Sequence, residues 1–181
     1  LINRFRGPSS CISRGLKKQT FYAHFPTKED LCVAYLNGRN SEKAKEILDF
    51  VDTKNTPLAR FHGVMDSIES WAKRTKYRGC QFINMVAEAP DRNSALREQG
   101  HLHHDWAKEL VLKLTKELIA SDKRRYGNLN AKDVTEAYIT HLTGAIALAG
   151  VRYRIQSCPR GREAGIGLML EQPAALNSLP R

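Results

Sequence analysis

The residues of this chain whose types and spacing favour chemistry lie together between Gly15 and Leu31. This stretch, GLKKQTFYAHFPTKEDL, gathers cations, an amide and polar aromatic side chains, and it contains no Asp or Glu before Glu29. Lysine side chains and the N–H groups of a helix N-terminus bind phosphates, and side-chain amides form hydrogen bonds to base edges. The composition of this stretch therefore favours contact with a nucleic acid.

One short helix, roughly residues 17–24, is predicted to present these groups. Leu16, Phe21 and Phe25 fall on one of its sides and are expected to face a core. The side chains of the opposite face are those of Lys18, Gln19, Tyr22 and His24. Gly15 supplies the backbone freedom that a tight turn before this helix needs. A turn followed by an exposed basic helix is the helix-turn-helix arrangement, whose second helix enters the major groove of DNA.

A second helix is predicted to begin directly after Pro26, which ends the first helix at about His24. Thr27 and Asp30 have the spacing of a capping box and stand just before an apolar residue. Lys28 lies in the first turn of this helix. Its cation and the unpaired N–H groups point the same way, so we expect them to hold a phosphate.

The stretch from Gly15 to Leu31 resembles the end of the DNA-binding domain in the TetR family of bacterial transcriptional regulators. The pattern there is roughly Gly-Val-Ser-x-x-Thr-Leu-Tyr-x-His-Phe-x-Ser-Lys-Glu-x-Leu, and nearly every position is filled here. The resemblance implies that Tyr22 and Lys28 contact backbone phosphates. It further implies that Lys18, Gln19 and His24 lie near base edges or phosphates. Thr20, Phe21 and Phe25 would have structural roles.

The sequence departs from that pattern in two places. Lys17 stands where the family usually has Ser or Thr, so the helix lacks its usual N-cap, which costs about 1 kcal/mol. A nearby phosphate offsets this cost and the unfavourable dipole, so we predict that Lys17 contacts DNA. Only seven residues separate Gly7 from Gly15, too few for a loop and a helix. We expect residues to be missing before Leu1 or between Ser9 and Gly15; a true deletion is the alternative.

The charge of the chain is concentrated at its N-terminus. The net charge of the 181 residues is +10, and the first 28 residues contain six Lys or Arg and no Asp or Glu. Such a block attracts a polyanion independently of sequence. A solvated basic surface without a partner is the alternative interpretation of the charge alone.

The cysteines and the hydropathy limit the class of protein. The four cysteines lack the close pairing of a zinc ribbon or a disulfide framework, and they are Cys11, Cys32, Cys80 and Cys158. Reduced thiols in a cytoplasm are therefore predicted. No apolar run approaches the length of about 20 residues that spans a bilayer, so we expect no membrane partner.

The rest of the chain is predicted to be helical, because no segment alternates with a period of two. The expected helices are 27–52, with a polar middle at 37–41, then 57–77, 78–89, 93–120, 131–155 and a weak helix at 162–171. Helix 57–77 should begin at Thr56 and Pro57, and helix 131–155 at Asn130. In helix 78–89 we expect Cys80, Ile83, Val86 and Ala87 to face inward. The fold class is all-α.

Three regions are predicted: a helix-turn-helix DNA-binding domain at 1–36, a ligand-binding and dimerisation domain at 37–172, and a tail at 173–181. Helix 131–155 is apolar over most of its circumference and must be buried on two sides, one of them against another subunit. In the resembled family two C-terminal helices form the dimer interface. The resemblance therefore implies a homodimer through 131–155 and 162–171.

The resemblance also implies a small-molecule effector bound among the helices of the C-terminal domain. Polar residues on apolar stripes and large apolar residues beside them are the candidates for its site. They are His62, Met65, Trp71, Gln81, Phe82, Asn84, Met85, His103, Trp106, Tyr138 and His141. For each of them, a place in the hydrophobic core is the alternative. We expect a small apolar or amphipathic effector.

Metal and catalytic sites have less support. His101, His104 and Asp105 share one helical face, but a stable metal site would need a further ligand such as His141 or His62. No serine nucleophile turn, Gly-rich phosphate loop or catalytic carboxylate pair is present, so we expect no enzyme, metal or cofactor.

These observations together predict a cytoplasmic, homodimeric transcriptional regulator. We expect it to act as a repressor that binds double-stranded operator DNA through Lys17 to Lys28 and leaves it on binding the effector. The alternative is a helical small-molecule binding or enzymatic domain whose basic N-terminus is only solvated.

Overall fold

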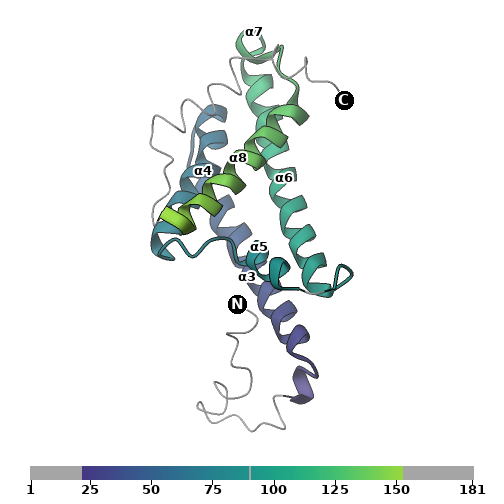
Figure 1. The fold of residues 1–181 in the computed structure, drawn as a ribbon. Coiled ribbons are helices and arrows are strands. Elements are labelled where there is room, and N and C mark those ends of the chain that lie inside the picture. The colour runs from purple at the N-terminus through teal and green to yellow at the C-terminus, as the bar shows by residue number, and fades with distance from the viewer. Residues whose placement is uncertain (1–21, 90, 153–181) are drawn as a thin grey trace. The chain divides into compact units, whose positions relative to one another are not determined.

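The computed structural model describes residues 22–89 and 91–152, and these residues form helices and connecting turns with no strand among them. The helices are α3 (Lys28–Asp52), α4 (Pro57–Arg74), α5 (Gln81–Glu88), α6 (Ala95–Ser121), α7 (Lys123–Tyr126) and α8 (Ala131–Arg152) (Figure 1). Residues 22–24 are also helical. The predicted all-α fold is confirmed for this part of the chain, although α7 was not expected. The predicted helix 162–171 and the tail lie outside the described residues.

Side-chain caps start the helices where the sequence predicts. The Thr56 hydroxyl accepts a hydrogen bond from the Ala59 N–H at 3.2 Å, and Pro57 occupies the first position of α4. The Asn130 side chain accepts from the Lys132 N–H at 2.9 Å before α8. Both caps satisfy N–H groups that have no partner within the helix.

The end of α4 corrects the predicted boundary at Tyr77, since the helix stops at Arg74. The N–H of Tyr77 bonds to the carbonyl of Ala72 at 2.8 Å, and the N–H of Lys76 bonds to that of Lys73 at 3.1 Å. This pair of bonds is the Schellman motif, which requires a left-handed residue beyond the helix. Lys76 and Tyr77 both have positive φ values, 55° and 54°. No glycine marks this stop, and the sequence therefore did not reveal it.

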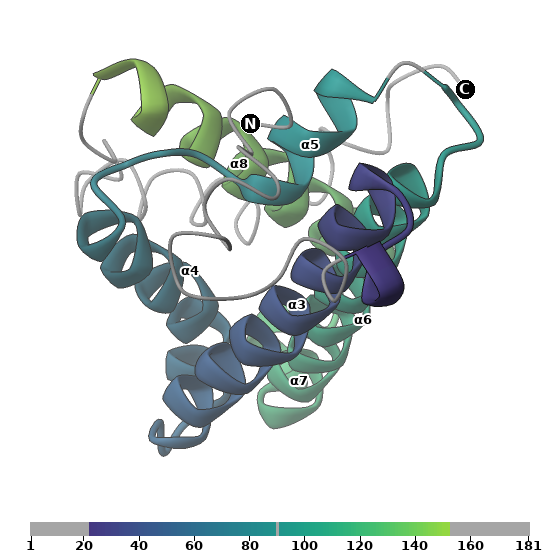
Figure 2. The ribbon, with the colours of Figure 1, turned by 90° about the horizontal axis from the view of Figure 1, so that it is seen from below.

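The chain divides into two compact units. Unit 1 contains residues 1–43 and 80–104, and unit 2 contains residues 44–79 and 105–181. Helix α3 is one continuous helix in both views (Figure 1 and Figure 2), and its residues up to Lys43 belong to unit 1. The boundary predicted after residue 36 is a different division, between a DNA-binding domain and the rest, and it stays a prediction.

Unit 1 encloses a small core in which α5 packs against α3 and α6. Its buried residues are Cys32, Leu36, Phe82, Met85, Ala89 and Leu96. The helices α5 and α6 approach closely at Gly100, where an added Cβ would lie 2.6 Å from Cγ2 of Val86. The predicted inward face of α5 is wrong at Ile83, which is 46% exposed, and at Ala87, which is also exposed, because Phe82 and Met85 are the buried residues. Cys80 packs against this core, as predicted.

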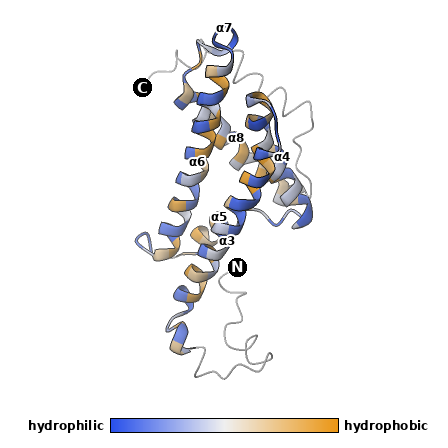
Figure 3. Ribbon diagram, turned by 180° about the vertical axis from the view of Figure 1, so that it is seen from behind, coloured by the Kyte–Doolittle hydropathy of each residue, from blue (hydrophilic) through white to orange (hydrophobic). Residues whose placement is uncertain are grey.

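Unit 2 contains the larger core, in which α4 packs on α8. Phe61 of α4 and Tyr138 of α8 meet edge to face, with ring centroids 4.8 Å apart. Val111, Leu114 and Leu118 cover the core from α6. Figure 3 shows hydrophobic and hydrophilic residues on the same helix along α6, as an amphipathic helix requires.

Candidate nucleic-acid interface

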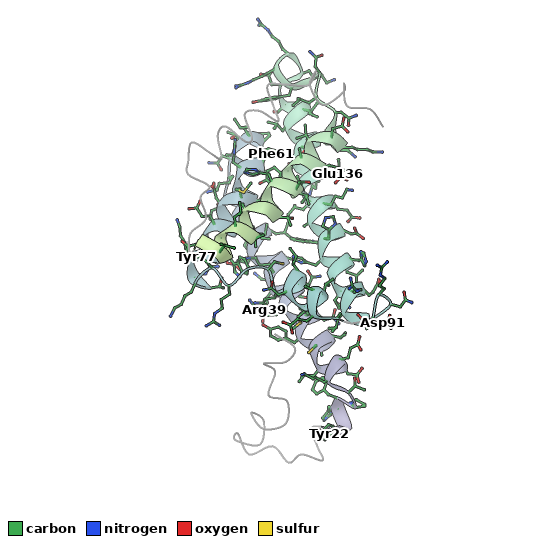
Figure 4. All side chains as sticks on the ribbon, in the orientation of Figure 1. Tyr22, Arg39, Phe61, Tyr77, Asp91 and Glu136 are labelled. Atoms are coloured by element: carbon green, nitrogen blue, oxygen red, sulfur yellow. The ribbon has the colours of Figure 1, made fainter. Side chains whose placement is uncertain are left out.

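We name residues Lys17 to Lys28 the reader, and its predicted DNA contacts are exposed where the structure describes them. Tyr22 is 44% exposed, and His24 and Lys28 are also exposed. Figure 4 shows Tyr22 beside the N-terminal end of α3. The other predicted DNA contacts, Lys17, Lys18 and Gln19, lie outside the described residues. The three described side chains thus meet the first requirement of a contact surface, which is access to a partner.

The predicted capping box joins the reader to α3, and its geometry is confirmed. The Asp30 carboxylate accepts hydrogen bonds from the Thr27 N–H at 2.9 Å and from the Thr27 hydroxyl at 2.7 Å. In return, the Thr27 hydroxyl accepts from the Asp30 N–H at 3.1 Å. Lys28 is the first residue of α3. The cap is worth about 1 kcal/mol and fixes where the reader ends and α3 begins.

The charge at this helix start is mixed. Glu29 and Asp30 lie in the first turn of α3 beside Lys28. Asp30 is occupied by the cap, but Glu29 adds a negative charge that weakens the attraction of the helix start for phosphate. The cations of the basic N-terminal block must therefore supply most of the attraction.

The eleven candidate effector residues fall into both compact units. Unit 1 contains Gln81, Phe82, Asn84, Met85 and His103, and unit 2 contains His62, Met65, Trp71, Trp106, Tyr138 and His141. Phe82 and Met85 are buried in the core of unit 1. Met65, Trp71 and Tyr138 are buried in the core of unit 2. The candidates are therefore divided between the two units.

Within unit 1, three of the candidates contact α3 directly or through one another. The Tyr35 hydroxyl of α3 donates a hydrogen bond to the Gln81 side-chain oxygen at 3.0 Å. Nδ1 of His103 lies 2.8 Å from Oδ1 of Asn40, also on α3. The His103 ring stacks on Phe82 with a centroid distance of 3.8 Å and an interplanar angle of 5°. We name these five residues the α3 clasp.

The His103 ring is held in its neutral form. Burial, followed by the positive charges of His104 and Lys43, lowers the pKa of His103 to about 4. Lys43 is itself only 8% exposed. Because the side-chain oxygen of Asn40, Oδ1, can only accept a hydrogen bond, the neutral ring donates its Nδ1–H to this oxygen.

Two residues of the α3 clasp, Tyr35 and Asn40, were not predicted as site residues. Asn40 lies in the polar middle of the predicted helix, 37–41, to which the sequence assigns no contact. Asparagine has a low helix propensity, so its presence inside a long predicted helix was the one sign in the sequence that Asn40 has a specific role. Its partner is 63 residues away in the sequence, so the pairing itself was not visible.

In unit 2 the Tyr138 hydroxyl is fully used by the backbone of α4. It donates to the carbonyl oxygen of Phe61 at 3.0 Å and accepts from the N–H of Met65 at 3.1 Å. Tyr138 has no exposed surface. Its hydroxyl thus ties α8 to α4, and this contact supports a structural role beside the predicted role in effector binding.

Replacing this tyrosine with phenylalanine should lower the stability of the fold. Tyr138→Phe removes both hydrogen bonds, and we expect the free energy of unfolding to fall by about 1–2 kcal/mol. Denaturant unfolding followed by circular dichroism measures the change. Tyr126→Phe is the matched control, because Tyr126 is buried and no hydrogen bond of its hydroxyl occurs within residues 22–89 and 91–152. An equal loss in both variants would contradict the role assigned to the Tyr138 hydroxyl.

The remaining unit 2 candidates lie at the margin of its core. His62 meets Phe61 edge to face at 6.1 Å, Trp106 packs against the core, and His141 is half-buried. The histidine and aspartate face considered for a metal, His101, His104 and Asp105, is exposed. Among the described residues, no three His, Cys, Asp or Glu side chains are placed to hold a metal ion. Over the same residues, no helix is long and apolar enough to cross a membrane.

Comparisons with protein-family models, curated proteins and solved structures found no match for this chain.

Proposed function

We propose that this protein is a cytoplasmic, homodimeric transcriptional regulator of the TetR type. It binds operator DNA through the reader, residues Lys17 to Lys28, and acts as a repressor. A small apolar or amphipathic effector releases it from DNA. The observation that carries the proposal is the exposed set Tyr22, His24 and Lys28 beside the capped start of α3.

The basic N-terminal block supports the DNA partner. Six Lys or Arg residues without a single acid precede Glu29, and Lys28 stands at the capped helix start. This arrangement attracts phosphates, and an exposed tyrosine and histidine add hydrogen-bond donors. The resemblance of residues 15–31 to the TetR pattern implies DNA contacts for the same side chains.

An exposed face of α8 supports the homodimer. Leu148 is 55% exposed and Val151 is 74% exposed. Thr140, Gly144 and Ala147 are exposed on the same side of the helix, and a Cβ added at Gly144 would meet no atom within 4 Å apart from its chain neighbours and the backbone of its own helix. Small residues beside two large apolar ones let a second helix approach closely. A second copy of this chain, packed by two-fold symmetry, would bury this face.

The two groups of candidate residues support an effector that is mostly apolar. In the unit 2 group, Met65 and Trp71 are apolar or aromatic, and His62 and His141 add a few polar atoms. Pockets for small molecules typically combine such apolar walls with a small number of polar groups. In the proposed mechanism the effector favours a dimer geometry in which the two readers are no longer about 34 Å apart.

Titration of duplex DNA at several salt concentrations tests the proposal. A dimeric reader should lose affinity steeply as salt rises, because each phosphate contact releases a counterion. Lys28→Ala should weaken binding about three- to tenfold and lower the slope of log K against log salt by about one per subunit. Tyr22→Phe, which removes only a hydroxyl group, should weaken binding with little change in that slope.

The matched control is Lys116→Ala, which removes an exposed lysine on α6 outside the reader. It should leave both affinity and slope unchanged. If the protein shows no sequence-preferring duplex binding at low salt, the proposal fails, and the alternative of a helical small-molecule binding domain replaces it.

A further inference from the structure

The apolar contacts of α3 in unit 1 do not by themselves fix its orientation. Cys32 and Leu36 have no exposed surface and pack against the core formed with α5 and α6. Apolar packing is non-directional, so a small rotation or slide of α3 costs little as long as the buried area is kept. Directional contacts must set the position of the helix.

The α3 clasp supplies two such contacts from two different helices. Tyr35 bonds to Gln81 of α5, and Asn40 bonds to His103 of α6. At 100° per residue, five residues separate these side chains by about 140° around the axis of α3 and by about 7.5 Å along it. Bonds at two such points resist both rotation and sliding.

The partners of α3 are themselves held in place. His103 stacks on Phe82, so the ring that binds Asn40 is fixed by α5 as well as by its own helix. The close approach of α5 and α6 at Gly100 leaves no room for a Cβ. A shift of α5 therefore reaches α3 both through Gln81 and through His103.

The reader ends where α3 begins, at Lys28, so the orientation of α3 matters at the DNA. Lys28 lies twelve residues, or about 18 Å of helix, before Asn40. A tilt of about 10° about Asn40 would move Lys28 by about 3 Å, which exceeds the range of a hydrogen bond to a phosphate.

We infer that Asn40 and His103 are positioning residues for DNA binding, and that the α3 clasp holds α3 in the orientation in which the reader fits the duplex. This inference rests on the proposed function. Any movement of α5 or α6 that separates Asn40 from His103 lowers affinity for DNA. The connection from α5 and α6 to the reader thus runs through a half-buried histidine and an amide, within unit 1.

A double-mutant cycle on DNA affinity tests the inference. The variants are Asn40→Ala, His103→Ala and the double variant. The DNA affinity of each is measured under conditions in which unfolding experiments show that the variant is folded. Each single variant should bind duplex DNA about tenfold more weakly, and the double variant should be no weaker than the worse single one. Asn40→Asp keeps an acceptor for the His103 N–H, and it should bind within about twofold of the unaltered protein.

The matched control cycle uses Asn37→Ala and His101→Ala, the same substitutions at exposed positions of the same two helices. These variants should stay within about twofold in affinity, with additive effects. The equilibrium constant of unfolding is measured for every variant. A role in stability alone would shift that constant while leaving the DNA affinity of the folded protein unchanged.

The outcomes separate this inference from the proposed function. If the unaltered protein binds DNA and Asn40→Ala binds it equally well, the inference is overturned and the proposed function stands. The same conclusion follows if the effects of Asn40→Ala and His103→Ala on affinity are simply additive. If the unaltered protein does not bind duplex DNA, both fail.

Discussion

Replacing Leu148 with glutamate is expected to turn the proposed dimer into a monomer. Leu148 is 55% exposed on α8, and two-fold symmetry would bring both copies into one interface. Leu148→Glu removes apolar burial from each subunit and places two negative charges where water is excluded. We expect the dissociation constant of the dimer to rise at least about 100-fold, which corresponds to about 2.7 kcal/mol. Analytical ultracentrifugation over a range of concentrations measures it.

Leu102→Glu is the control for this substitution. Leu102 is 48% exposed on α6 in unit 1, outside the predicted dimer helices. The same change there should leave the association state unaltered. A Leu148→Glu protein that dimerises as tightly as the unaltered one would exclude this face of α8 from the interface. If the unaltered protein is monomeric at micromolar concentration, the proposed homodimer is wrong.

Acidification should destabilise the fold through His103. Its pKa is lowered from the ordinary value of 6.5 to about 4, chiefly by burial. The unfolded chain therefore binds the proton more readily than the folded one between these two values. The stabilising contribution of the neutral ring is complete above pH 6.5 and is lost as the pH falls toward 4. Between pH 7 and pH 5 the free energy of unfolding should fall by about 2 kcal/mol from this group alone.

Denaturant unfolding at pH 7, 6 and 5 measures this dependence. His103→Gln removes the titrating group, and its stability should change by about 2 kcal/mol less over the same range. His101→Gln changes an exposed histidine of the same helix and should keep the full dependence. An equal loss of stability on acidification in His103→Gln and in the unaltered protein would show that His103 is not held neutral in the folded protein.

The parts of the structure that depend on local sequence were predictable. The capping box of Thr27 and Asp30 joins residues three apart, and the structure forms all of its hydrogen bonds. Thr56 and Pro57 start α4 as expected. Such signals need no knowledge of the fold, because the groups that they satisfy belong to the same turn of helix.

The parts that depend on contacts between distant residues were not predictable from one sequence. Tyr35 and Gln81 are 46 residues apart, and Asn40 and His103 are 63 apart. The eight residues of α5 span barely two turns, too short for the apolar pattern to define its inward face. Ile83 was therefore assigned to the core that Phe82 and Met85 occupy.

Helix α7 was missed for a different reason. Its sequence, Lys123–Tyr126, contains three cations and no apolar periodicity. The Asp122 side chain accepts a hydrogen bond from the Arg125 N–H at 3.0 Å, and Tyr126 is buried in the core of unit 2. A single turn held by a cap and one anchored side chain leaves no pattern long enough to recognise.

Transplanting this reader onto another regulatory protein would require more than an N-terminal fragment. Unit 1 is assembled from two separate stretches of chain, and a cut after Lys43 would remove both Gln81 and His103 along with their helices. The exposed side of the severed α3 would then carry Cys32 and Leu36, which are fully covered in the intact protein. A working chimera must therefore carry residues 80–104 together with the reader, and an isolated N-terminal peptide should aggregate rather than fold.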